Sequence, residues 1–296
     1  MNPHSPRPRR LHWLDGMILV LVLIAIGYVY YRVDSVLNYN WDWSFLPGYL
    51  IRWDQERGRW VANILLQGLA TTLRLALWSM VLAGIIGMLM GVMRTSRRLL
   101  FRLISRTYVE LIRNIPPLVF IFVFYFFISS QLMPWFGIAA MARDLSPTMA
   151  MLTGWLIGPP ELLENVISGI ICLAMFEGAY VTEITRAGIQ AVPPSQREAG
   201  ASIGLGRWQI MRYVVLPQAV RKVVPPLANQ FIALIKDSSI VSLISIQELT
   251  FLGTEVSVST QRVFETWIAV AGLYFILCYG LAWLFGRLER RWQLKQ

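Results

Sequence analysis

Six long runs of mostly apolar residues divide the chain, and polar segments separate them. The runs cover residues 14–31, 64–93, 107–133, 162–184, 224–246 and 263–285. A helix needs about 20 apolar residues to cross the hydrocarbon core of a bilayer, and each run approaches or exceeds that length. Backbone N–H and C=O groups must find partners inside a membrane, which favours helices over open strands. The pattern therefore predicts an all-α fold, a polytopic bundle of membrane-spanning helices.

Two apolar segments need a separate interpretation. The first run follows three arginines in residues 7–10, as in a secretory signal peptide, but no small-residue cleavage site comes after it. Three tyrosines in residues 28–31 fit an interfacial belt, so an uncleaved anchor is favoured over a signal peptide. The apolar patch at 149–157 is too short to span, and we expect it to lie in the interface or to re-enter the membrane.

Composition supports a membrane protein and excludes other classes. Of the 296 residues, 56% are hydrophobic and 15% are charged, whereas a soluble domain usually has about 25% charged residues. The net charge of +10 does not indicate a nucleic-acid partner, because no base-reading module is visible. Cys172 and Cys278 lie inside apolar runs, so they are interpreted as buried hydrophobic residues and not as disulfide or metal ligands.

The distribution of Lys and Arg predicts the orientation of the chain. These residues are concentrated in the N-terminal tail, in 94–106, in 186–222 and at the C-terminus, and they are sparse in the intervening outer segments. By the positive-inside rule, both termini are cytoplasmic. Trp53 and Arg143 are then outside, and the tryptophans between residues 41 and 60 are expected to anchor an outer segment at the interface.

One cytoplasmic segment, residues 192–218, carries an ordered pattern of turn and cap residues. A double proline at 193–194 is expected to end the preceding helix. Ser195 and Glu198 have the S-x-x-E spacing of a capping box, which predicts a short helix starting at Ser195. Gly204, with a second glycine two residues later, supplies its stop. Two turns of helix are not stable alone in water, so this helix must dock on another surface.

The side chains of this segment indicate how it docks. Ala199 and Gly200 are small, so another surface can approach the helix closely. A second short helix is expected at 207–215, ended by Pro217. Three of its apolar residues are expected on one face: Trp208, Met211 and Val215. The pattern favours a compact knob for a partner's groove over the alternative of an ordinary basic loop held by lipid headgroups.

The same segment resembles the signature of ATP-binding-cassette (ABC) importer permeases, E-A-A-x3-G-x9-I-x-L-P. The matching residues here are Glu198, Ala199, Gly200, Gly204, Val214, Leu216 and Pro217, with glycine for the last alanine and valine for isoleucine. Four further stretches resemble the polar amino acid and opine branch of that family: GLATTLRLALWSMVLAGIIGMLMGVMRTS (68–96), YVELIRNIPPLVFIFVFYF (108–126), EITRAGIQAVP (183–193) and LIKDSSIVSLISIQEL (234–249). The resemblance covers about 64–285, a type I importer core of five spans to which the first span is an addition.

The resemblance implies that the chain works together with other subunits, each with its own role. Residues 61–290 would form the permease domain, following an anchor segment at 1–60, and 192–218 would be the coupling loop on an ATPase subunit. Expected partners are two ATPases, a second permease chain, identical or different, and an extracytoplasmic amino-acid-binding protein, all at a bacterial inner membrane. The chain has no G-x-x-x-x-G-K-[ST] loop, so ATP and Mg²⁺ are expected in the ATPase and no cofactor in this chain. The substrate would be a polar amino acid of the glutamate, aspartate, glutamine or basic type, moved by alternating access.

Ionisable and polar residues inside the spans are candidates for the substrate path, because burying them in lipid is costly. The candidates are Glu177, Lys236, Asp237, Ser238 and Asn114. The opposing interpretation, polar contacts that hold helices together, stays open. Arg74 and Arg113 are near span ends and are expected to snorkel. Pro116 and its neighbouring proline predict a break in the third span, with Asn114 available to the freed backbone groups.

The sequence fits two other classes of function less well. An ion-coupled secondary transporter would use titrating carboxylates such as Glu177 and Asp237, but many such folds contain inverted repeats and none is visible here. A membrane enzyme would need a catalytic set, whereas His4 and His12 are the only histidines and no nucleophile–base motif is visible. The ABC permease is therefore the predicted function, with the ion-coupled transporter as the alternative.

Overall fold

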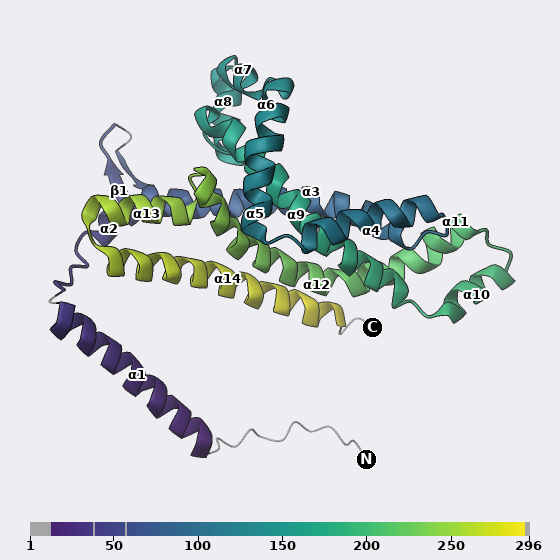
Figure 1. Ribbon diagram of the computed structural model, residues 1–296, viewed down its shortest axis with the longest axis horizontal. Coiled ribbons are helices and arrows are strands. Elements are labelled where there is room, and N and C mark those ends of the chain that lie inside the picture. The colour runs from purple at the N-terminus through teal and green to yellow at the C-terminus, as the bar shows by residue number, and fades with distance from the viewer. Residues whose placement is uncertain (1–12, 38, 57, 294–296) are drawn as a thin grey trace. The chain divides into compact units, whose positions relative to one another are not determined.

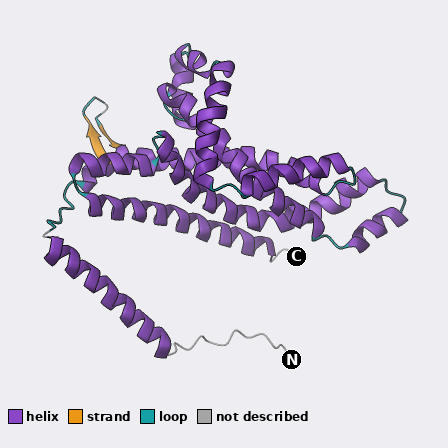
Figure 2. Ribbon diagram, in the orientation of Figure 1, coloured by secondary structure: helices purple, strands orange, loops and turns teal. Residues whose placement is uncertain are grey.

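The computed structural model describes residues 13–37, 39–56 and 58–293, and it is helical almost throughout (Figures 1 and 2). The chain forms two compact units, 1–44 and 45–296. The predicted N-terminal arginines, both histidines and the extreme C-terminus lie outside the described residues. In the first unit, α1 (Trp13–Leu37) contains a 20-residue stretch apolar enough to cross a membrane, as the first run predicted.

The second unit begins with a small element that the sequence did not predict. Helix α2 (Leu46–Leu50) leads into an antiparallel hairpin of β1 (Ile51–Asp54) and β2 (Arg59–Ala62). Trp53 pairs with Trp60 across the hairpin, and the two rings meet edge to face with centroids 5.6 Å apart. Both indoles are largely exposed, which fits the amphipathic anchoring expected for this segment.

Two long helices form the centre of the bundle, α3 (Ile64–Arg94) and α9 (Leu163–Gln190). The buried face of α3 carries small residues about every fourth position: Gly68, Thr72, Ala76, Ser79, Ala83, Gly87 and Gly91. A Cβ added at Gly87 would come within 2.5 Å of Val181, and one added at Gly91 within 2.5 Å of Thr185. Small residues let membrane helices approach closely, and this explains the tight contact of α3 with α9.

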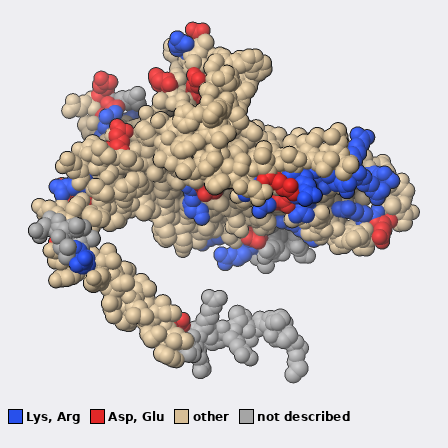
Figure 3. Space-filling view, viewed as in Figure 1, with Lys and Arg blue, Asp and Glu red and all other residues tan. Residues whose placement is uncertain are grey.

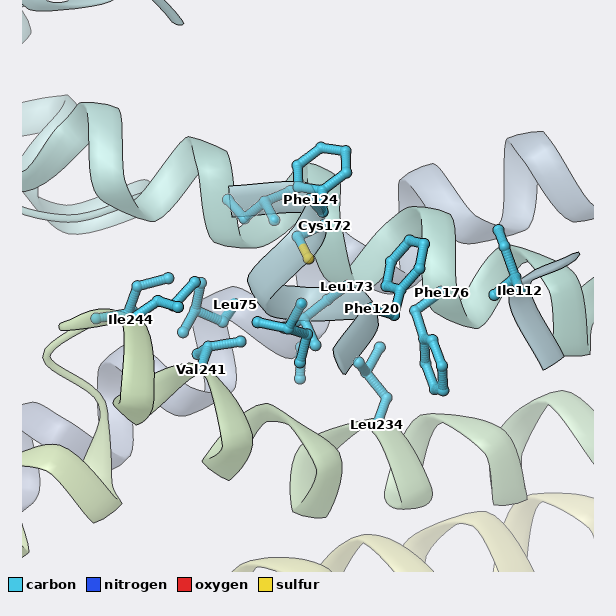
Figure 4. Close-up of a cluster of buried hydrophobic side chains, with 14 of the residues drawn as sticks. Leu75, Ile112, Phe120, Phe124, Cys172, Leu173, Phe176, Leu234, Val241 and Ile244 are labelled. Atoms are coloured by element: carbon cyan, nitrogen blue, oxygen red, sulfur yellow. The ribbon is translucent and has the colours of Figure 1, made fainter. Parts of the chain in front are cut away.

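Aromatic and aliphatic side chains from the surrounding helices fill the space beside this pair. Figure 4 shows Phe120 and Phe124 above α9, with Leu234 approaching from the other side. Cys172 is buried in the same cluster and is a free thiol, as the sequence indicated. The bundle core is therefore apolar, and its few polar groups stand out.

The third predicted span, 107–133, was wrong at its start. Residues 107–113 belong to α4 (Leu99–Arg113), and a new helical segment begins after a break as α5 (Pro117–Val123), continuing through the π-helix η1 (Phe124–Ser129) and α6 (Ser130–Phe136). The double proline causes the break, as predicted. The Asn114 amide donates to the Glu110 carbonyl oxygen at 2.7 Å, but that oxygen also accepts from the Asn114 backbone N–H at 3.3 Å, so the amide does not serve a group freed by the prolines and this expectation was wrong.

An arm of short helices follows this span. Helices α7 (Ile138–Arg143) and α8 (Pro147–Leu156) and the 3-10 turn η2 (Pro160–Leu162) stand with α6 beside the long helices and lead into α9 (Figure 1). The apolar patch at 149–157 lies mostly in α8. The Trp78 indole N–H donates to the Leu156 carbonyl oxygen at 3.0 Å, which attaches the arm to α3.

The C-terminal half contains the predicted loop and two further spans. Its elements are α10 (Pro194–Ser202), α11 (Arg207–Gln209), π-helix η3 (Ile210–Val215), α12 (Leu216–Asp237), 3-10 helix η4 (Ser238–Ile244), α13 (Leu249–Thr260) and α14 (Val263–Gln293). Pro217 does not end a helix, contrary to the prediction. It lies at the start of α12, which continues without interruption from η3, so the chain stays helical through this proline.

The fourth and fifth spans also differ from their predicted limits. Helix α9 continues to Gln190, past the predicted end at 184, because its polar last turns still have helix-forming residues. The fifth predicted span, 224–246, starts earlier and ends in a break at Ser245, which has φ of 61°. Helix α13 follows that break in the same general direction (Figure 1) and was not predicted.

Candidate functional site

The loop predicted to be cytoplasmic, residues 192–218, is built around the short helix α10. Pro194 occupies its first turn and Pro193 is its N-cap residue, so the helix starts one residue before the predicted Ser195. No side chain caps its N-terminus, and the predicted capping box of Ser195 with Glu198 was therefore wrong. Proline is well suited to the first helical turn because its φ is already fixed there, and it displaces Ser195 from the capping position.

The predicted glycine stop is confirmed. Gly204 has φ of 82°, and the N–H groups of Gly204 and Leu205 donate to the carbonyl oxygens of Ala201 and Gly200 at 3.0 and 3.1 Å. This is the Schellman arrangement that satisfies the last carbonyls of a helix. The Gln209 side chain then accepts from the Gly206 N–H at 2.8 Å and helps to start the next helix.

Gly200 faces the chain itself and not a partner's groove. It is the buried residue of α10, and a Cβ added there would lie 3.1 Å from Ile210 and 3.6 Å from Val214. Ala199, its neighbour in the signature, is exposed. The small size of Gly200 therefore lets α10 pack on η3, while the residues around it remain available to a partner.

Large apolar side chains lie on the outer surface of the loop, which is the surface that faces away from α9 and α12. Ile203, Trp208 and Tyr213 are 75%, 73% and 69% exposed, and Glu198 is also exposed. Met211 and Val215 instead turn inward, so the predicted common face with Trp208 was wrong. The π-helical turn of η3 follows a different repeat from the α-helix, and this changes which residues align.

The inner surface of the loop is attached to the ends of two membrane helices. Ile189, Val192, Val215 and Ala219 form a small apolar cluster beneath it. Leu216 and Pro217 of the signature lie at the start of α12, next to that cluster. The loop thus packs as one structural piece with the adjoining ends of α9 and α12.

A second group of candidate residues lies inside the bundle. Glu177, near the middle of α9, is 0% exposed, and its Oε2 accepts from the Gln230 amide of α12 at 2.6 Å. Asp237 of α12 interacts electrostatically with Glu177. Oε1 of Glu177 has no hydrogen-bond partner among the described residues. Two carboxyl groups and an amide therefore meet between α9 and α12.

The other predicted path residues do not join this group. Lys236 is exposed, while the Ser238 hydroxyl is buried and donates to the Ile235 carbonyl oxygen at 2.8 Å. Asn114 lies at the end of α4 with its side chain on that helix. Gln230 was missed by the sequence reasoning, although it lies seven residues before Asp237 and so on the same face of the helix.

A buried carboxylate that the sequence reasoning missed joins three helices. Glu248 is 0% exposed and caps α13 by accepting from the Phe251 N–H at 2.9 Å. Its other oxygen accepts from the Tyr274 hydroxyl at 2.7 Å and the Thr72 hydroxyl at 3.3 Å. Glu248 precedes the apolar run LTFL, and an acidic residue at that position is a helix-start signal.

Ion pairs join the neighbouring ends of the two central helices, the end of α3 and the last turns of α9. Glu183 of α9 pairs with Arg94 at the end of α3 at 3.1 Å and with Arg186 at 2.7 Å. Arg186 also donates to the Gln190 side chain at 2.6 Å. Within the described ranges no cluster of His, Cys, Asp or Glu could hold a metal ion. The candidate site thus consists of an exposed loop and a set of polar contacts between helices.

Comparison with known proteins places the chain in a family. A family model described as "Binding-protein-dependent transport system inner membrane component" matches residues 83–294. The glutamine transport system permease protein GlnP of Escherichia coli (strain K12) is 31% identical over 231 residues, which cover 78% of this chain and 94% of GlnP. The inner membrane amino-acid ABC transporter permease protein YhdY of the same strain is 28% identical and aligns with 98% of this chain and 73% of its own length.

A solved structure agrees with this assignment. A crystal structure of an amino acid ABC transporter with histidines has a chain that matches with a TM-score of 0.61 and 31% identity, covering 77% of this chain and 94% of that one. The predicted helical fold with six candidate spans is confirmed by the same likeness. The chain therefore belongs to the family of inner membrane components of binding-protein-dependent transport systems.

Proposed function

We propose that this chain is the permease subunit that carries a polar amino acid inward across the bacterial inner membrane by alternating access. Membership of the family assigns the membrane component to this chain and ATP hydrolysis to a separate subunit. The relatives' names supply the substrate class: glutamine for GlnP and octopine for OccM of Rhizobium radiobacter. No observation favours the ion-coupled alternative, and uptake that requires the ATPase and ATP would distinguish the two.

The cytoplasmic loop carries this proposal. Its inner surface is fastened to α9 and α12, while its outer surface presents Ile203, Trp208 and Tyr213 with nothing packed over them among the described residues. Large apolar side chains exposed in a cytoplasmic segment are typical of a protein interface. The partner is an ABC ATPase, which would hold ATP and Mg²⁺, so this chain needs no cofactor.

The remaining partners follow from the family. A second permease chain, identical or different, would complete the pathway, and an extracytoplasmic binding protein would deliver the amino acid to the outer side. Residues 61–290 would supply the permease domain of each assembly, and 1–60 the added anchor. The substrate would pass Glu177, Gln230 and Asp237, since the unpartnered Oε1 of Glu177 leaves an acceptor for an ammonium group.

The orientation of the chain is a testable part of this proposal. We expect a single cysteine at position 198 to resist a membrane-impermeant thiol reagent in intact cells, and cysteines at 53 and 143 to react. Figure 3 supports this, because Lys and Arg side chains gather at the end of the second unit that carries α10 and α11. Cys172 and Cys278 are replaced first, and efficient labelling at 198 without permeabilisation would contradict the orientation.

Reversing one charge on the outer surface of the loop tests the docking. Glu198→Arg is expected to reduce co-purification of the ATPase about tenfold, because an exposed interfacial charge of the wrong sign disfavours the complex. Pull-down of tagged permease from detergent extracts measures this. Glu161→Arg changes an exposed acidic residue of η2, the turn that precedes α9, and it is the matched control that should retain the ATPase. Equal co-purification of the ATPase with both variants would mean that the ATPase binds another part of the chain.

A further inference from the structure

The helix α10 is attached to two membrane helices by contacts of different kinds. Towards α12, Gly200 packs against Ile210, and the Gln218 amide donates to the Gln196 side chain at 3.3 Å. Towards α9, the Arg197 guanidinium donates to the Ile189 carbonyl oxygen at 3.0 Å. The first attachment is mainly apolar contact, whereas the second is a charged, directional hydrogen bond.

The hydrogen bond from Arg197 ends at the cytoplasmic terminus of α9. The last carbonyl groups of a helix lack intrahelical donors and carry partial negative charge. Two of them find cationic donors here, because Arg197 serves Ile189 and the Lys222 ammonium serves Ala191. The two cations come from different elements, Arg197 from α10 and Lys222 from α12.

Tight packing of α9 against α3 is expected to carry a movement of the end of α9 into the interior of the bundle. Gly87 and Gly91 place α3 directly against Val181 and Thr185 of α9, and Glu183 joins the two helices by its ion pair with Arg94. Close-packed helices shift together because their interiors have few voids. A displacement applied at Ile189 therefore reaches the centre of the bundle, where α9 also carries Glu177.

We propose that Arg197 is a positioning residue that transmits movement of α10 to α9, and so couples ATP hydrolysis to the reorientation of the bundle. This rests on the proposed function, in which α10 docks on the ATPase. The contact with η3 joins α10 to α12, whereas the Arg197 bond fixes one point of α10 to one carbonyl group of α9. The Arg197 side chain is otherwise exposed, so its replacement is not expected to disturb a packed core.

The test measures coupling in a reconstituted complex of permease, ATPase and binding protein. The readout is amino acid transported per ATP hydrolysed. Arg197→Gln is expected to lower this ratio about tenfold, because a charged hydrogen bond contributes roughly that factor, while the ATPase still co-purifies and still hydrolyses ATP. Arg197→Lys keeps the charge and should restore part of the ratio.

Lys222→Gln is the matched control, since it removes a cation from the same end of α9 without touching α10. It should leave the ratio close to that of the unmodified chain. An equal decrease of the ratio in both variants would overturn the proposal, because Arg197 would then act only as a cap of α9. An unchanged ratio in Arg197→Gln would overturn it as well. Failure of the proposed function would instead show as no ATP-dependent uptake by the unmodified complex.

Discussion

Gly200→Leu is expected to unfold the cytoplasmic loop and to abolish co-purification of the ATPase. A Cβ at this position already lies 3.1 Å from Ile210, so three further carbon atoms have no space between α10 and η3. Overpacking of this kind costs about 1–3 kcal/mol or more, and a two-turn helix has little stability of its own to offset it. Proteolysis of the loop in inverted membrane vesicles, together with ATPase pull-down, would measure both effects.

Two neighbouring changes separate loop stability from docking. Gly200→Ala adds the Cβ alone, and alanine favours a helix over glycine by about 1 kcal/mol, so this variant should keep the loop and the ATPase. Ala199→Leu places bulk on the exposed side of α10 and should leave the loop resistant to protease. If Gly200→Leu gives a protease-resistant loop that holds its ATPase, the packing of α10 on η3 is wrong.

Glu177→Gln is expected to lower amino acid uptake about tenfold or more while assembly with the ATPase is unchanged. Glutamine has nearly the volume of glutamate and can still accept from Gln230, so the contact between α9 and α12 survives. What it loses is the negative charge that an ammonium group would meet at the unpartnered Oε1, and a charged hydrogen bond contributes roughly this factor. Amino acid uptake into proteoliposomes measures the effect, and the expression level and the ATPase pull-down serve as references.

The variant Gln230→Leu distinguishes a path from a helix contact. It removes the amide that bonds Glu177 but leaves the carboxylate in place. If the group only holds α9 to α12, Gln230→Leu should reduce assembly and uptake together, and Glu177→Gln should be nearly silent. Glu161→Gln, an exposed change on the outer side, controls for the loss of one negative charge.

The sequence by itself determined the class of fold and the family. Runs of apolar residues long enough to cross a bilayer leave the helix as the available structure, because backbone groups must be satisfied within each segment. The spacing from Glu198 to Pro217 predicted a coupling loop, and Gly204 marked the end of α10 because a left-handed position strongly favours glycine. These are local properties, so they can be read without knowledge of contacts.

The tertiary structure alone decided which contacts each residue of the site makes. Gly200 looked like a docking surface but packs inward, because the side on which a small residue faces depends on where η3 lies. Ser195 lost its predicted cap to the neighbouring prolines. Glu177 meets Gln230, and Arg197 meets the Ile189 carbonyl oxygen, only because α9, α10 and α12 converge in space. Pairing across helices is set by packing, and no periodicity in a single segment encodes it.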